Sequence, residues 1–332
     1  MDHRIPAARL QRRALLAGAA GLAAAGRAHA QRPEDWPTQT VRYINLYAPG
    51  GATDIASRAW CAAMSTVTGH QFVVENRSGA GGTVGTDAIA KSRPDGYTVG
   101  LGSVATLAIA PSLYASLPYH PENDFTFISG LWRQPNLLMV SNDLPVRSVP
   151  ELIDLLRKNP GRYHYAVGGA GTTPHLTGEM FKTMAQVEMP VVTYRGGAPA
   201  LVDVLAGRVP ILFDNFSGPI GAVREGKLRG LAVTSPERSP AAPELPALAE
   251  FLPGFDITSW NGVVGPAGIP PAMVMRMNAL TKRALERPEL LRTYTENGAT
   301  PWWTTPEDFR TYRRVQAEKM AVLVKASGAR VE

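Results

Sequence analysis

Short apolar runs that end in a glycine-rich turn and continue into a helix-like segment recur along this chain. Four of them are VRYINLYAPGG (41–51), QFVVENRSGAGG (71–82), YTVGLGSVATL (97–107) and YHYAVGGAGTTPH (163–175). Strands that alternate with helices are typical of α/β folds with largely parallel sheets. Ligands of such sheets bind at the carboxyl ends of the strands, which is where these glycine turns lie.

Two helices carry explicit start signals. In SVPELIDLLRKNPG, Ser148 is the expected N-cap, Pro150 the first helical residue and Glu151 the partner in a capping box. Thr305 and Pro306 repeat this pattern before the last long segment. We expect that segment to be a helix packed on the body, with an apolar stripe of Phe309, Tyr312, Val315 and Val322.

The first thirty residues have the pattern of an export signal. Arg12 and Arg13 precede the apolar run ALLAGAAGLAAAG, and an A-x-A site ends at Ala30. The paired arginines favour the twin-arginine route, although an ordinary Sec signal stays open. The run is far shorter than the roughly 20 residues of a membrane span, which disfavours an anchor. We therefore expect cleavage near Ala30 and a periplasmic location.

Most of the apparent positive charge belongs to this leader. Without five arginines and Asp2, the 34 basic and 28 acidic residues become 29 and 27, a net charge of +2. No run of Lys and Arg interleaved with aromatics follows, so nucleic acid is not an expected partner. About 300 residues remain, which are enough for two domains.

Cofactor and catalytic signatures are not found in the sequence. There is no GxSxG, HExxH, GxGxxG or Walker A pattern, and GAGGTVG (79–85) has its third glycine one residue too late for a dinucleotide loop. The histidines are scattered without the spacing of metal ligands. The only cysteine, Cys61, is expected on the buried face of a helix. We expect no cofactor, no metal and no catalysis.

Two of the glycine turns, PGGATD (49–54) and GGAGTT (168–173), have the composition of anion sites. Unpaired backbone N–H groups at a helix start, aided by the helix dipole, stabilise a carboxylate without a charged side chain. The alternative for any one turn is tight turning alone.

Three ionisable residues lie close to these turns. Asp54, in a first helical turn, is expected to accept backbone N–H bonds as a cap. His175 is either a packing or capping residue that supports its loop or a polar group facing a ligand. Asp214 ends the strand ILFDN and could accept a hydrogen bond from a ligand hydroxyl or a water.

Several motifs, in order, give the chain a resemblance to the solute-binding proteins of tripartite tricarboxylate transporters, the Bug family. They include YAPGGATDIASR, VVENRSGAGGTVGTDAIAKSRPDGYTV, GTTPHLTGEMF, TYRGGAPALVDVLAGRV and FDITSWNGVVGPAGIP. The resemblance implies a two-domain periplasmic-binding-protein fold of the type II kind, with the ligand cleft between the domains.

The expected domain boundaries place crossings near residues 131–135 and 252–260. Residues 31–132 with 254–332 would form a discontinuous domain I, and residues 133–253 domain II. The resemblance also implies a monomer that binds a small organic carboxylate and hands it to the membrane subunits of a tripartite transporter.

The resemblance implies a ligand site built from loops of both domains. Its residues in the first domain would be Ala48, Gly50, Gly51, Ala52, Asp54, Ser103 and Ala105. Those of the second domain would be Gly169, Gly171, Thr172, His175, Tyr194 and Asp214.

Two alternatives stay open at this stage. The same fold could serve as a periplasmic solute sensor for a signalling partner. A hydrolase or isomerase would need Asp54, His175 or Asp214 as its acid or base. The sequence does not say which carboxylate is bound.

Overall fold

The computed structural model describes residues 35–327, so the predicted export signal lies outside the described residues. The strands are β1 (Val41–Asn45), β2 (Phe72–Asn76), β3 (Thr98–Ser103), β4 (Phe125–Ser141), β5 (Tyr165–Val167), β6 (Val191–Thr193), β7 (Ile211–Asn215), β8 (Leu228–Val233), β9 (Thr258–Pro266) and β10 (Thr300–Pro301). The helices are α2 (Ala52–Thr68), η2 (Ala80–Gly82), α3 (Thr83–Ala90), η3 (Ala105–Ile109), α4 (Ala110–Leu113), α5 (Val149–Lys158), α6 (Thr173–Ala185), α7 (Gly197–Leu205), α8 (Ile220–Arg224), η4 (Leu248–Glu250), α9 (Pro271–Leu285), α10 (Pro288–Glu296) and α11 (Pro306–Ser327).

The strands form two groups that share β4. The main path runs β2-β1-β3-β9-β4-β7-β5-β6, and β8 and β10 also pair with β4. Strand β1 is parallel to β2 and β3, and β5 is parallel to β6 and β7. The α/β prediction is confirmed, but β4 and β9 run antiparallel to their neighbours because they carry the chain between the two groups.

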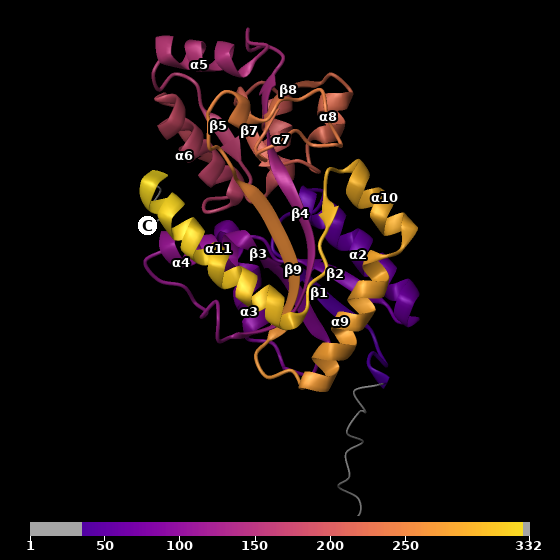
Figure 1. The fold of residues 1–332 in the computed structure, drawn as a ribbon. Helices are drawn as coiled ribbons and strands as arrows, with labels where there is room; N and C mark the ends of the chain where they lie inside the picture. The colour runs from indigo at the N-terminus through magenta and orange to yellow at the C-terminus, as the bar shows by residue number, and fades with distance from the viewer. Residues whose placement is uncertain (1–34, 328–332) are drawn as a thin grey trace, which may run out of the picture. The chain divides into compact units, whose positions relative to one another are not determined.

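Strand β4 changes partners partway along its length. Its residues from Phe125 to Pro135 pair with β9, and those from Asn136 onward pair with β7. Figure 1 shows β4 and β9 running from the lower strands to the upper ones. This change lies next to the predicted crossing at residues 131–135, while the domain boundaries themselves stay a prediction.

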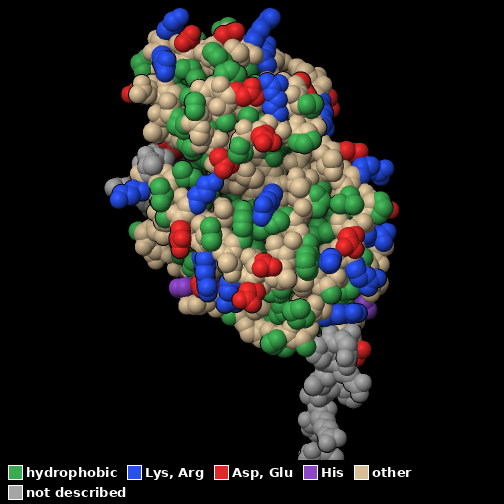
Figure 2. Space-filling view, viewed as in Figure 1, with side chains coloured by type: hydrophobic (Ala, Val, Ile, Leu, Met, Phe, Trp, Pro, Cys, Tyr) green, Lys and Arg blue, Asp and Glu red, His purple; other side chains and the backbone are tan. Residues whose placement is uncertain are grey.

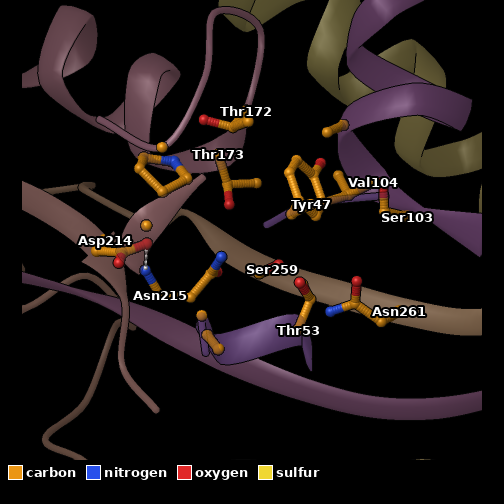
Figure 3. Close-up of a pocket in the computed structure, with 16 residues that line it drawn as sticks. Tyr47, Thr53, Ser103, Val104, Thr172, Thr173, Asp214, Asn215, Ser259 and Asn261 are labelled. Atoms are coloured by element: carbon orange, nitrogen blue, oxygen red, sulfur yellow. Dashed lines mark hydrogen bonds between the residues drawn. The ribbon is translucent and has the colours of Figure 1, made fainter. Parts of the chain in front are cut away.

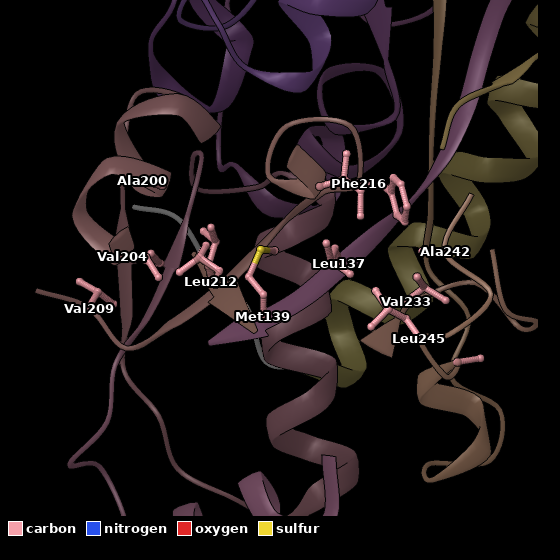
Figure 4. Close-up of a cluster of buried hydrophobic side chains, with 14 residues drawn as sticks. Leu137, Met139, Ala200, Val204, Val209, Leu212, Phe216, Val233, Ala242 and Leu245 are labelled. Carbon is pink, nitrogen blue, oxygen red and sulfur yellow. The ribbon is translucent and has the colours of Figure 1, made fainter. Parts of the chain in front are cut away.

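The upper group has its own apolar core. Leu137 and Met139 of β4 pack with Leu212 and Phe216 at β7, and Val204 of α7 closes the cluster. Figure 4 shows these side chains gathered between the strands and α7. Each is fully buried, which at about 25 cal/mol per Å² makes this cluster a main source of stability for the upper group.

Helix starts largely follow the predicted signals. The hydroxyl of Ser148 accepts from the N–H of Glu151, although Val149 rather than Pro150 is the first residue of α5. The hydroxyl of Thr305 accepts from the N–H of Asp308 at the start of α11. Cys61 is buried in α2, as predicted, and burial raises the pKa of its thiol.

Charges of both signs are mixed on the surface. On the face shown in Figure 2, Lys and Arg side chains stand beside Asp and Glu rather than merging into one patch. Within residues 35–327, no helix is long and apolar enough to cross a membrane.

Candidate functional site

A cavity lies where the starts of several helices meet β7 and β9. Its volume is about 30 Å³, room for about two or three water molecules. The lining residues are Tyr47, Gly51, Ala52, Thr53, Ser103, Val104, Ala105, Gly168, Thr172, Thr173, Pro174, Gly197, Asp214, Asn215, Ser259 and Asn261. Figure 3 shows Asp214 and Asn215 on one side, with Tyr47, Ser103 and Asn261 across from them.

Three α-helices begin at this cavity. Helix α2 follows Gly51 and α7 follows Gly196, and neither start has a side-chain cap. Helix α6 follows Thr172, whose hydroxyl accepts from the N–H of His175. Since first-turn N–H groups lack partners within the helix and carry the positive end of its dipole, the three starts make the cavity favourable for an anion.

Two amide side chains at the cavity each have a buried atom without a partner. The Nδ2 of Asn261 and the Oδ1 of Asn215 have no hydrogen-bond partner within the described part of the chain. Asn261 is 1% exposed. A buried donor without a partner costs free energy, so a ligand or water that accepts from Asn261 would recover it.

The lining contains no Lys, Arg or His side chain. Its ionisable groups are Tyr47 and Asp214. Burial raises the pKa of Tyr47 to about 12, and its hydroxyl donates to the carbonyl of Gly81 at 3.3 Å. Across residues 35–327, no group of three His, Cys, Asp or Glu side chains could hold a metal ion.

Asp214 ends β7 and is 4% exposed. Its Oδ1 accepts from the N–H of Asn215 at 2.8 Å. Burial raises the pKa of the Asp214 carboxyl to about 7, and the hydrogen bond from Asn215 opposes that rise. At neutral pH this carboxyl is therefore divided between its ionised and neutral forms.

Asp54 supports the first loop and does not line the cavity. Its Oδ2 accepts from the N–H of Gly50 and from Arg58 Nε, both at 2.9 Å, and its Oδ1 accepts from Asn76 Nδ2 at 2.8 Å. Burial raises the pKa of the Asp54 carboxyl, but the bonds from Arg58, Gly50 and Asn76 outweigh it and the net pKa is lowered. Asp54 thus accepts a backbone N–H bond, as expected of a cap, but from Gly50, which lies just before the helix.

His175 supports the second loop. Its Nδ1 accepts from the N–H of Gly171 at 3.1 Å, and the residue is outside the cavity lining. Burial lowers the pKa of the imidazole, which keeps it neutral and able to accept this bond. Of the two alternatives open from the sequence, the geometry favours loop support.

Six of the thirteen predicted site residues line the cavity: Gly51, Ala52, Ser103, Ala105, Thr172 and Asp214. The remaining seven do not line it: Asp54 and His175, described above, and Ala48, Gly50, Gly169, Gly171 and Tyr194. Tyr194 donates its hydroxyl to Asp203 at 2.7 Å. The role of each predicted residue in binding stays a prediction.

Glycines near the cavity lie where loops of the lower and upper groups approach each other. A Cβ at Gly50 would lie 3.9 Å from the Cβ of Ala198, and one at Gly196 would lie 2.9 Å from that of Ala48. Nearby, a Cβ at Gly81 would lie 2.2 Å from the carbonyl oxygen of Ala170. The loops of the lower and upper groups are therefore in contact around the cavity.

Several lining residues had little signal in the sequence. Asn261 and Ser259 lie on β9, a segment expected in part to be a domain crossing. Gly197 belongs to the glycine pair of TYRGGAPA. A glycine pair before a helix was the one feature that could have indicated Gly197 as a lining residue.

Solved structures of similar fold define the class. R. palustris Rpa4515 with adipate is 35% identical with a TM-score of 0.87, and the match covers 89% of this chain and 100% of that one. MatC from Rhodopseudomonas palustris with bound malate is 28% identical with a TM-score of 0.82, covering 87% and 100%. The fold is that of the two-domain periplasmic binding proteins.

The sequence comparisons define the family. The model of the tripartite tricarboxylate transporter family receptor, TctC, matches residues 56–329. Protein BugT of Bordetella pertussis is 33% identical over 313 residues, which are 94% of this chain and 96% of that relative. The chain belongs to the TctC receptor family, as the resemblance in its motifs implied.

Proposed function

We propose that this protein captures a small organic carboxylate in the periplasm and delivers it to the membrane subunits of a tripartite tricarboxylate-type transporter. The observation that carries the proposal is the meeting of the starts of α2, α6 and α7 at one cavity. Backbone N–H groups at these starts supply the positive potential that an anion needs.

Two buried side chains add hydrogen-bond donors to the site. Asn261 offers an unpartnered N–H donor from β9, and Ser103 offers a hydroxyl from β3. Donors that are already held in place cost little entropy when a carboxylate binds. The ligand therefore exchanges its hydration for fixed donors on both sides of the cavity.

The relatives support the same ligand class. Two proteins of closely similar fold were solved with adipate and with malate, both of which are dicarboxylates. We extend this class to the present chain and propose a carboxylate that reaches donors on opposite walls.

We propose that the protein performs no chemistry on its ligand. Asp54 is engaged by Gly50 and Arg58, and His175 by Gly171, so the three acid or base candidates do not converge on one reacting centre. Only Asp214 of the three lines the cavity. Export, a monomeric state and the delivery step belong to the same proposal, because each is expected of a family receptor.

The experiment is a thermal-shift screen of the mature protein against dicarboxylates, aromatic acids and amino acids, followed by calorimetry of the hits. A ligand that binds only the folded state raises the melting temperature in proportion to RT ln(1 + [L]/Kd). Asn261→Ala should weaken binding about tenfold, the loss of one hydrogen bond to a charged group. Asn123→Ala, an exposed amide on the loop before β4, is the matched control and should bind as the parent does.

The absence of any carboxylate ligand would contradict the proposal. Turnover of a bound ligand, monitored by mass spectrometry, would contradict its non-catalytic part. Delivery is tested by uptake in cells that carry the transporter's membrane subunits with and without this receptor.

A further inference from the structure

Asp214 is an unexpected residue in a cavity for carboxylates. It is the one carboxylate among the lining residues, and the lining offers no cationic side chain to pair with it. Two ionised carboxylates in the same small, buried site would repel each other strongly, since the interaction is poorly screened there.

The carboxyl group is packed against two glycines. A Cβ at Gly197 would lie 2.1 Å from Asp214 Oδ2, and one at Gly218 would lie 3.2 Å from the same oxygen. Backbone from the first turn of α7 and from the loop after β7 therefore encloses the carboxyl group. Only the absence of side chains at these two glycines leaves space for it.

The charged groups on the surrounding elements are engaged elsewhere. On α7, Asp203 pairs with Arg208 and accepts from Tyr194. Arg195, before α7, is exposed. No pairing from this side neutralises Asp214.

The remaining neighbouring elements show the same pattern. On α6, Glu179 pairs with Lys182, and His175 accepts from the N–H of Gly171. On α2, Asp54 pairs with Arg58. On β4, Arg133 stacks on the rings of Trp302 and Tyr312, at 4.1 and 4.6 Å. Within residues 35–327, the hydrogen bond that the Asp214 carboxyl accepts thus comes from the N–H of Asn215.

We propose that Asp214 is neutral when the solute is bound and donates its O–H to a carboxylate of that solute, so that binding takes up one proton. The inference rests on the proposed function and specifies the protonation of that site. The proton comes from solvent, and no covalent bond changes. The raised pKa of Asp214, about 7, makes the proton available near neutral pH.

A definite pH dependence follows. Below pH 7 the carboxyl is already neutral and affinity is constant. Above pH 7 each binding event must first protonate Asp214, so the observed Kd should rise about tenfold per pH unit. A carboxylate solute stays ionised throughout pH 6–9 because its own pKa values lie near those of Asp and Glu, about 4.

The test is calorimetry at pH 6, 7, 8 and 9 with the dicarboxylate that gives the largest thermal shift. Wild type should lose affinity above pH 7 and take up close to one proton per ligand at pH 8, measured in two buffers of different ionisation enthalpy. In Asp214→Asn the amide is a permanent donor, so the affinity should become independent of pH. The slope with pH is the readout. The control is Asp256→Asn, which alters a half-buried carboxylate outside the cavity lining that pairs with Lys319, and it should keep the wild-type slope.

The outcomes separate this inference from the proposed function. Binding by wild type that neither changes with pH nor takes up a proton would overturn the inference and leave the carboxylate receptor intact. Affinity that rises with pH would also overturn it, because Asp214 would then be ionised and pair with a cationic or hydroxyl group of the solute. No carboxylate bound at any pH would overturn the proposed function itself. If Asp214→Asn does not fold, the proton uptake of wild type still decides.

Discussion

Gly197 shows how closely the cavity is built around individual atoms. It is the first residue of α7, and a methyl group added there would overlap the Asp214 carboxyl. The backbone of Gly197 and the carboxyl of Asp214 can share this space only because glycine has no side chain. Requirements of this kind depend on three-dimensional contacts, so they cannot be read from the glycine pair in the sequence.

Replacement of Gly197 by alanine should therefore damage both stability and binding. Overpacking of this kind costs about 1–3 kcal/mol, and the displaced carboxyl would narrow the cavity. Gly221→Ala in α8 is the matched control, since a Cβ there meets nothing within 4 Å. The control should gain about 0.4–1 kcal/mol from reduced freedom of the unfolded chain. Urea unfolding of both variants decides, and equal effects would contradict the steric explanation.

The titration of Asp214 should also be visible in the stability of the ligand-free protein. Its folded-state pKa is raised, so its contribution to stability is fully present below the unfolded pKa, near 4, and is lost as pH rises through about 7. Asp214→Asn removes this dependence. The variant should therefore become more stable relative to wild type between pH 5 and pH 8, by at least about 1 kcal/mol. A difference in melting temperature that stays constant over this range would show that the carboxyl titrates normally.

Residue roles could be predicted where they depend on local sequence. Asp54 accepts a backbone N–H beside a helix start because its position in the first turn brings the carboxylate there. The resemblance placed Tyr194 in the site, whereas its hydrogen bond to Asp203 of α7 depends on a contact that the motif does not encode, and its role in binding stays a prediction. Asn261 was missed because its position in the cavity depends on the pairing of β9 with β3 and β4.

At the scale of elements, α11 differs most from its expected pattern. Phe309, Tyr312, Val315 and Val322 were expected to form its apolar stripe. Phe309 is buried, whereas Val315 and Val322 are 57% and 68% exposed, so that part of the prediction is wrong.

Arg313 lies on the buried face of α11, which the apolar pattern did not predict. It is 7% exposed, pairs with Glu122, and its Nη1 donates to the carbonyl of Leu107 in η3 at 3.4 Å. Met320 and Val324 continue the buried face. A hydrophobicity pattern cannot identify a buried arginine, because its partners come from distant parts of the chain.

Loss of Arg313 should loosen this helix. Arg313→Ala removes an ion-pair partner of Glu122 and a donor to the carbonyl of Leu107. We therefore expect the free energy of unfolding to fall by about 1–3 kcal/mol. Arg314→Ala removes the more exposed partner of the same carboxylate and should cost about 0–1 kcal/mol. Chemical denaturation gives both values, and a larger effect for Arg314 would contradict the importance of burial.

At the scale of the whole described body, the closed loops and the small cavity imply movement. The cavity volume is about 30 Å³, enough for only a few waters, so we expect the loops of the two groups to separate when a dicarboxylate enters. The single strand β4, shared by both groups, and β9 beside it are the places where such a hinge would bend. Closure itself stays a prediction, as do the exact domain boundaries.

A disulfide across the loop contact should capture the closed state. A Cβ at Gly50 would lie 3.9 Å from that of Ala198, within the usual 3.5–4.5 Å of a disulfide. Gly50→Cys with Ala198→Cys should form this bond and exclude free ligand until a reductant is added. The single variant Gly50→Cys controls for its positive φ of 79°. If the oxidised double variant bound ligand as fast as the reduced one, entry would not require these loops to part.

The α/β alternation and the glycine loops were predictable because strands, helices and their turns follow local chemistry. The convergence of α2, α6 and α7 on one cavity was not, since it depends on how β4 and β9 join the two groups. The family resemblance supplied that long-range information, which the spacing of residues alone does not contain.

The helix starts around the cavity also bear on how such receptors diverge. Substitution changes side chains and leaves peptide N–H groups in place, so an anion holder made of backbone survives sequence drift that would erase one made of arginines. Side chains such as Thr53 and Ser259 line the same cavity, and their replacement would not remove these N–H groups. New solutes could then be acquired through a few wall residues, while the means of holding a negative charge is inherited with the fold.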